Sequence, residues 1–187
     1  MEDTVNIREL VQTWSDEERA EAINVVLRFP LGQKSFYAWC ATTVTCPHEY
    51  CILNPEKTRI LLFTREDSDP FFGGQWHVSG SLRLPDETGF DTWQRAIVKY
   101  GLNTMILTLP IPIGAHDTLK GAQLESKCPR GNERNLVHVS YATSGSKSKG
   151  KGEWFFLNNL PLVGRNALLG HHQAYIREVL MPWIQRT

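Results

Sequence analysis

The 187-residue sequence has no excess of charge of either sign and no long apolar run. Its 20 basic and 20 acidic residues give a formal net charge of zero, so no global field attracts nucleic acid or an acidic membrane. Its apolar runs are far shorter than the roughly 18 residues of a membrane-spanning helix. The acidic, polar start at residues 1–4 is unlike a secretory signal. We therefore expect a cytoplasmic protein with neither a membrane nor a nucleic acid as its partner.

Cysteine is scarce as well, with four residues. In a chain without a signal peptide, so few thiols are expected to be reduced rather than joined in a disulfide framework. Cys46 and Cys51 flank a histidine, but four residues separate them and no second ligand pair has the spacing usual for zinc. Residues 46–57, which contain two prolines, are therefore predicted to form a loop, with a zinc site as the alternative.

Residues 1–30 are predicted to form a helical extension, and residues 31–187 a single main domain. Ser15 and Glu18 form a capping-box pattern, in which a serine oxygen and a glutamate satisfy free amides at a helix start. Apolar residues then recur at helical spacing until Pro30. We expect this extension to pack on the main domain, with a homodimer contact as the alternative.

The main domain alternates short apolar segments with one long polar segment. Apolar and β-branched stretches predict strands at residues 36–44, 59–64, 75–82, 105–113, 135–142 and 154–157. Helical spacing predicts a helix between Thr88 and Gly101 and another at residues 166–184. Residues 116–133 are polar and are predicted to form a long loop. A mixed sheet flanked by helices is the economical arrangement, so the predicted fold class is α/β.

The helix between Thr88 and Gly101 has the clearest boundaries in the sequence. Thr88 with Asp91 forms a second capping-box pattern, and Gly101 stands where a left-handed residue ends a helix. Its apolar face consists of Phe90, Trp93, Ile97 and Tyr100. We expect this face, and Trp93 in particular, to pack in the core.

This helix and the residues before it resemble the signature of the Nudix hydrolases, G-x5-E-x7-R-E-U-x-E-E-x-G-U preceded by W-x-x-P-G. The matching residues are Trp76, Ser79-Gly80, Glu87, Arg95 and Gly101-Leu102. The segments 61–65 and 154–161 are similar to flanking motifs of the family. The resemblance covers residues 35–185 and implies a Nudix-like α/β/α sandwich. It also implies activity on a nucleoside diphosphate linked to another group.

Two registers of this resemblance are possible. In the first, Glu87 takes the place of the first signature glutamate and Arg95 that of the arginine, and Gly101 comes one residue early. In the second, Gly80 and Gly101-Leu102 fit without a gap, but Asp86 replaces the glutamate and Gln94-Arg95 replaces Arg-Glu. We favour the first because it matches more residues and keeps the arginine.

In either register, the glutamates that hold divalent metal in the family are missing from the helix. Their positions fall among Arg95, Ala96, Val98, Lys99 and Tyr100, and no Asp or Glu occurs at residues 92–116. Magnesium and manganese prefer oxygen ligands, so a metal would have to be held from elsewhere. The candidate metal ligands are Asp86, Glu87 and Glu133. The cofactor is therefore Mg²⁺ or Mn²⁺ if the protein is active, and otherwise none.

One branch of the family, the GDP-mannose mannosyl hydrolases, has a similarly altered signature. Asp86-Glu87-Thr88 and Trp93-Gln94-Arg95 match it, whereas Lys99-Tyr100 stands where that branch keeps a glutamate. The resemblance implies a nucleotide-sugar ligand and a histidine base. Asn135 aligns with that base, so His138 nearby is the candidate, with Glu87 as the second catalytic candidate. A histidine satisfied within the sheet is the alternative for His138.

The domain could also bind without cleaving. The candidate ligand-binding residues are Arg65, His77, Gly80, Arg83 and Arg95, because cationic side chains make charge-assisted contacts to a diphosphate. A surface position for Arg65 and a structural ion pair for Arg95 are the alternatives. Two functions follow: a divergent hydrolase-like protein that acts on or binds a nucleoside diphosphate derivative, or an inactive Nudix domain that senses a nucleotide or contacts proteins.

Overall fold

The chain forms two compact units, Met1–Trp39 and Cys40–Thr187. The computed structural model describes residues 12–28, 32, 35, 38–40, 43–69, 71–84, 86–119, 132–143 and 152–187. The predicted boundary at residues 30 and 31 lies outside the described residues. No described helix is long and apolar enough to cross a membrane.

The N-terminal unit contains the predicted helix, α2 (Asp16–Arg28). Its capping box is formed in both directions: the Ser15 amide donates to Glu18 Oε2 at 2.7 Å, and the Glu18 amide donates to Ser15 Oγ at 3.2 Å. These bonds satisfy two of the free amides at the helix start. The prediction of an N-terminal helix is thereby confirmed.

The larger unit is built on a seven-stranded mixed sheet. Its strands are β1 (Pro47–Leu53), β2 (Arg59–Thr64), β3 (Trp76–His77), β4 (Ser79–Leu82), β5 (Ile111–Thr118), β6 (Glu133–Tyr141) and β7 (Gly152–Phe156). The order is β3-β2-β1-β6-β5, with β4 paired to β1 and β7 to β2. Only the β1–β6 pair is parallel among these pairings. The predicted mixed sheet is confirmed.

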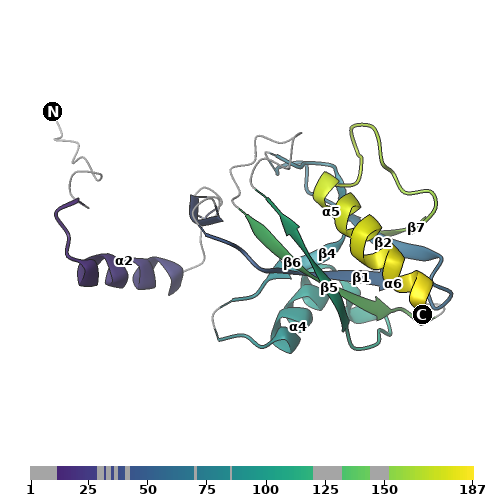
Figure 1. Ribbon diagram of the computed structural model, residues 1–187, viewed down its shortest axis with the longest axis horizontal. Helices are drawn as coiled ribbons and strands as arrows, with labels where there is room; N and C mark the ends of the chain where they lie inside the picture. The colour runs from purple at the N-terminus through teal and green to yellow at the C-terminus, as the bar shows by residue number, and fades with distance from the viewer. Residues whose placement is uncertain are drawn as a thin grey trace. The chain divides into compact units, whose positions relative to one another are not determined.

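Helices cover both faces of this sheet (Figure 1). One face carries α4 (Gly89–Lys99), and the other carries α5 (Gly170–Tyr175), the π-helical segment η2 (Ile176–Leu180) and α6 (Met181–Arg186). Alternate residues of β1 point to the two layers. Tyr50 packs with Trp93 of α4, while Cys51 packs with Tyr175 of α5. Because of this alternation, polar side chains of β1 that face α4 are separated by the sheet from those that face α5.

Several sequence predictions need correction. Residues 46–57 are not a loop, because β1 occupies most of them and every residue of that strand is buried. Pro47 is the first residue of the strand, where its missing N–H costs little. The strand predicted at residues 36–44 is wrong, since residues 38–40 are helical. The strand predicted at residues 105–113 begins later, at Ile111, and has a bulge between Pro112 and Gly114.

A further correction concerns the C-terminal helix and the long loop. The helix begins at Gly170 rather than at residue 166, and η2 divides it. Strand β5 extends to Thr118 and so takes up the start of the segment predicted as a loop. Residues 120–131 of that segment, including Cys128, lie outside the described residues.

Candidate functional site

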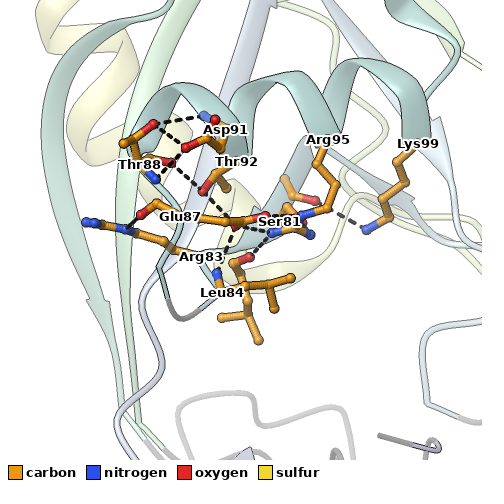
Figure 2. A network of polar contacts seen from close by, with 11 residues as sticks. Ser81, Arg83, Leu84, Glu87, Thr88, Asp91, Thr92, Arg95 and Lys99 are labelled. Carbon is orange, nitrogen blue, oxygen red and sulfur yellow. Dashed lines mark hydrogen bonds and ion pairs between the residues drawn. The ribbon is translucent and has the colours of Figure 1, made fainter. Parts of the chain in front are cut away.

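The turn before α4 and the start of the helix are fixed by short-range hydrogen bonds (Figure 2). Thr88 and Asp91 form the predicted capping box: the Asp91 amide donates to Thr88 Oγ1 at 3.2 Å, and the Thr88 amide donates to Asp91 Oδ2 at 2.8 Å. Gly101, just beyond the helix, has a φ of 63°, a left-handed conformation that favours glycine. Asp86 is also left-handed, with a φ of 64°, in the turn that leads to Glu87.

Glu87 is held by Arg95. Arg95 Nε donates to Glu87 Oε1 at 2.8 Å, and Arg95 Nη2 donates to Oε2 at 2.7 Å (Figure 2). The Leu84 amide and the Thr92 hydroxyl donate to Oε2 as well, at 2.9 and 3.2 Å. The hydrogen bonds from Arg95, followed by that of the Leu84 amide, lower the pKa of Glu87 to about 2. The Glu87 carboxylate is thus an ion already satisfied by the protein.

Arg95 joins this loop to the sheet. Besides its ion pair, it donates to Ser81 Oγ and to the Leu82 carbonyl oxygen, both in β4. Arg83, at the end of β4, donates to the Glu87 carbonyl oxygen and is exposed. The Glu87–Arg95 pair agrees with the first of the two registers, in which these residues take the places of a glutamate and an arginine of the signature.

The predicted metal ligands are not gathered into one site. Asp86 is exposed in the turn, Glu87 is paired with Arg95, and Glu133 is buried on β6. Within the described part of the chain, no three His, Cys, Asp or Glu side chains are grouped so that they could hold a metal ion. Cys46 is exposed just before β1 and Cys51 is fully buried within it, so the alternative zinc site is not formed among the described residues either.

A second group of polar side chains, separate from those around Glu87 and Arg95, is centred on Glu49 of β1. No role is predicted for Glu49 from the sequence. Glu49 pairs across the sheet with Gly80 of β4 and is 7% exposed. A Cβ atom on Gly80 would overlap the Glu49 carboxylate, so only glycine allows the carboxylate to lie there. The Glu49 cluster comprises Glu49, Gly80, Arg65, His77, Lys99, Tyr100, Glu133, His172 and Tyr175.

Helix α5 supplies one side of the Glu49 cluster. The Tyr175 hydroxyl donates to Glu49 Oε2 at 3.3 Å and lies 2.6 Å from His172 Nδ1. The Val78 amide donates to the same His172 Nδ1 at 3.0 Å, so that nitrogen is an acceptor and the imidazole is neutral. The single Tyr175 hydroxyl proton thus lies within hydrogen-bond distance of both Glu49 Oε2 and His172 Nδ1.

Cationic side chains surround the same carboxyl group. Burial, followed by the nearby Glu133 charge, raises the pKa of Glu49 to about 7, while Arg65 and Lys99 act in the opposite direction. Arg65 Nε is buried without a hydrogen-bond partner among the described residues. His77 is buried, and burial followed by the nearby Arg65 charge holds its pKa well below the usual value. His77 is therefore a neutral ring, and Arg65 is a cation with an unused donor.

The end of α4 reaches the Glu49 cluster through one backbone oxygen. Lys99 Nζ donates to the Gly80 carbonyl oxygen at 3.3 Å, and the Tyr100 hydroxyl donates to the same oxygen at 3.1 Å. Both side chains thus bind Gly80, the residue against which the Glu49 carboxylate lies. Lys99 itself is exposed, so its ammonium group is open to solvent on its other side.

His138 lies on the opposite face of the sheet from the Glu49 carboxylate. It pairs with Tyr50, and its ring stacks on that of His48 with centroids 5.1 Å apart. Its Nδ1 lies 3.0 Å from the Leu136 carbonyl oxygen, and burial lowers its pKa. The structure therefore places His138 among aromatic rings that face α4, and its role as a base stays a prediction.

Two solved structures identify the fold. The chain is similar to the MutT protein from Methanosarcina mazei Go1 with a TM-score of 0.52 and 17% identity, over 76% of this chain and 94% of that one. It is similar to a mutT/nudix family protein from Listeria innocua with a TM-score of 0.51 and 15% identity, over 77% and 96%. The chain has a Nudix-like fold. No protein-family model and no curated protein matches the sequence.

The divalent metal that the Nudix fold implies does not fit the residues at the end of α4. The register with Glu87 and Arg95 matched puts Lys99 and Tyr100 at positions of metal-binding glutamates. An ammonium group and a phenol are not ligands for magnesium, and both already donate to the Gly80 carbonyl oxygen. Glu49 and Glu133 interact electrostatically, but among the described residues they are not part of any group of three His, Cys, Asp or Glu side chains that could hold a metal ion.

Sequence reasoning missed Glu49, Tyr175 and His172 for different reasons. Glu49 lies in the segment predicted to be a loop. The run from His48 to Leu53 nevertheless contains aromatic and β-branched residues, which are typical of a strand. Tyr175 and His172 carry no local signal of a role near Glu49, because only the packing of α5 on the sheet brings them to Glu49 and Val78. Lys99 stands where the resemblance expects a glutamate, and its hydrogen bond to the Gly80 carbonyl oxygen is visible only in the structure.

Proposed function

We propose that this Nudix-like domain binds a nucleoside diphosphate linked to another group, without a divalent metal and without hydrolysing it. The observation that carries the proposal is the pair of bonds from Lys99 and Tyr100 to the Gly80 carbonyl oxygen. Hydrolysis of the Nudix type needs metal ions to neutralise the diphosphate and to activate water. A lysine in the place of the metal ligands supplies charge neutralisation but no activated water.

The cations of the Glu49 cluster provide contacts for a diphosphate. The Arg65 side chain is 23% exposed and pairs with Asp69 through Nη1 at 3.7 Å, and Lys99 has donors left after its bond to Gly80. Hydrogen bonds from such cations to phosphate oxygens are charge-assisted and roughly twice as strong as neutral ones. Glu87 and Arg95 act as positioning residues, since they satisfy each other and hold the loop beside β4. A nucleotide sugar is the ligand that the resemblance of residues 86–88 and 93–95 favours.

The proposal is tested by ligand binding in the presence of a chelator. Nucleotide sugars, dinucleotides and nucleoside triphosphates are screened by thermal shift with EDTA, with Mg²⁺ and with Mn²⁺, and product release is followed in parallel. A ligand at 100 times its Kd stabilises the folded state by about 2.7 kcal/mol. We expect stabilisation that survives EDTA and no product.

A pair of arginine variants locates the site. Arg65→Met removes a charged donor and is expected to weaken binding about tenfold, because such bonds contribute roughly 1.5 kcal/mol or more. Arg59→Met is the matched control, since Arg59 stands at the other end of β2, roughly 20 Å away at about 3.3 Å per residue. Metal-dependent turnover that Glu87→Gln abolishes would instead establish the hydrolase. Equal binding by both arginine variants would place the ligand elsewhere.

A further inference from the structure

Three groups of different charge meet at Gly80. The Gly80 carbonyl oxygen accepts a hydrogen bond from Lys99 Nζ at 3.3 Å. The Glu49 carboxylate occupies the space that a Cβ atom on Gly80 would fill. Lys99 is close enough to Glu49 for the ammonium charge to favour the ionised carboxylate. A carbonyl oxygen, a carboxylate and a cation therefore lie together, contributed by β4, β1 and α4 respectively.

Without the lysine, the same place would suit a hard divalent cation. Carbonyl and carboxylate oxygens are the ligands that Mg²⁺ and Mn²⁺ take, and a third carboxylate from α4 would add the charge that tight binding needs. With the lysine, the position beside the carbonyl oxygen is filled by a group that bears positive charge and donates hydrogen bonds. Like charges at this distance repel, so the ammonium group excludes a metal ion while supplying part of its charge.

We propose that the Lys99 ammonium group is a built-in replacement for the divalent cation, and that it neutralises phosphate oxygens beside Gly80 and Glu49. The assignment rests on the proposed function only for the identity of the anion. Arg65 is the second cation of the same subsite, and Tyr100 keeps the Gly80 carbonyl oxygen oriented. The chemical class of ligand is a phosphate ester or diphosphate bound without metal.

The decisive variant is Lys99→Glu, which replaces the cation with the missing carboxylate. Lys99 is exposed in the last turn of α4, so glutamate is tolerated sterically there. The variant is expected to bind Mn²⁺ at least about tenfold more tightly than the wild-type chain, because one ligand is gained and one repelling charge is lost. Binding is measured by loss of the free Mn²⁺ signal in electron paramagnetic resonance, and independently by Mn²⁺-dependent thermal stabilisation.

Two controls distinguish a new Mn²⁺ site at residue 99 from the general effect of one added negative charge on the helix. Gln94→Glu places a glutamate on an exposed position of the same helix and is expected to bind Mn²⁺ no better than wild type. Adding Glu49→Gln to Lys99→Glu removes the second carboxylate and should abolish the gain. If Lys99→Glu folds poorly, Lys99→Gln removes only the charge, and a smaller gain in Mn²⁺ affinity is still expected.

The outcomes distinguish this inference from the proposed function. Mn²⁺ binding to the wild-type chain that matches the Lys99→Glu variant would overturn the inference, as would a Lys99→Glu variant that behaves like Gln94→Glu. A gain of Mn²⁺ affinity in Lys99→Glu, with inorganic phosphate but no nucleotide bound by the wild-type chain, would refute the proposed function and support the inference; if no phosphate compound is bound by any form, the inference is overturned as well. Nucleotide binding that survives EDTA and weakens in Lys99→Gln would support both.

Discussion

Replacing Glu49 with glutamine tests whether the buried carboxyl group destabilises the folded protein above neutral pH. Burial raises the pKa of Glu49 from 4.5 to about 7 in the folded protein. The folded state therefore keeps a proton that the unfolded state releases, and stability falls as the pH rises from about 4.5 to about 7. The difference of 7 − 4.5 = 2.5, at about 1.4 kcal/mol per pH unit, corresponds to roughly 3 kcal/mol.

The Glu49→Gln variant should lack this decline, because an amide of the same shape does not ionise. We expect the variant to gain about 3 kcal/mol relative to wild type between pH 4 and pH 8, with most of the change complete near pH 7. Urea unfolding at several pH values measures the difference, in which the contributions of other groups cancel. Glu153→Gln, at an exposed position of β7, controls for the loss of one negative charge. A difference that does not change with pH would refute the assignment of a buried, proton-holding carboxyl group.

Three further variants test the packing and the loop by chemical denaturation. Arg95→Met should destabilise by about 2 kcal/mol at pH 7, and this loss should shrink as the pH falls from 4.5 towards 2, where Glu87 takes up its proton. Trp93→Ala should cost about 3–5 kcal/mol because its side chain is buried between α4 and the sheet. Gly101→Ala should cost about 1 kcal/mol, since its φ of 63° is left-handed; an unchanged midpoint would contradict the strain argument.

The parts of the fold that could be predicted are those encoded within a few residues. Strand β2 is a continuous apolar run, and α4 begins at a capping box and ends before Gly101. These features need only local hydrogen bonds and local backbone preferences. The Glu87–Arg95 pair spans eight residues. The resemblance singles out both residues and an ion pair is one alternative for Arg95, but the sequence does not predict that Glu87 is its partner.

The centre of the candidate site could not be predicted in the same way. Pro47, His48 and Glu49 make the start of β1 look like a loop, since such residues are depleted in buried strands. Glu49 is tolerated there because Tyr175, 126 residues away, donates to it and because Gly80 leaves room. Neither condition is visible in the neighbourhood of Glu49. The error in β1 therefore hid the residue around which the second polar cluster is organised.

The loop and helix of this chain separate two tasks that the Nudix signature combines. Holding the loop needs the Glu87–Arg95 pair and Gly101, whose contributions are independent of any metal. Holding a metal needs carboxylates at the end of the helix, where Lys99 stands instead. The first task needs no metal ligand, so the loop and helix can form in a chain that shares the fold at 17% identity and has a lysine at this position. The likeness of fold is therefore no argument for turnover, and the variants at Lys99 test whether its charge takes the place of a metal ion.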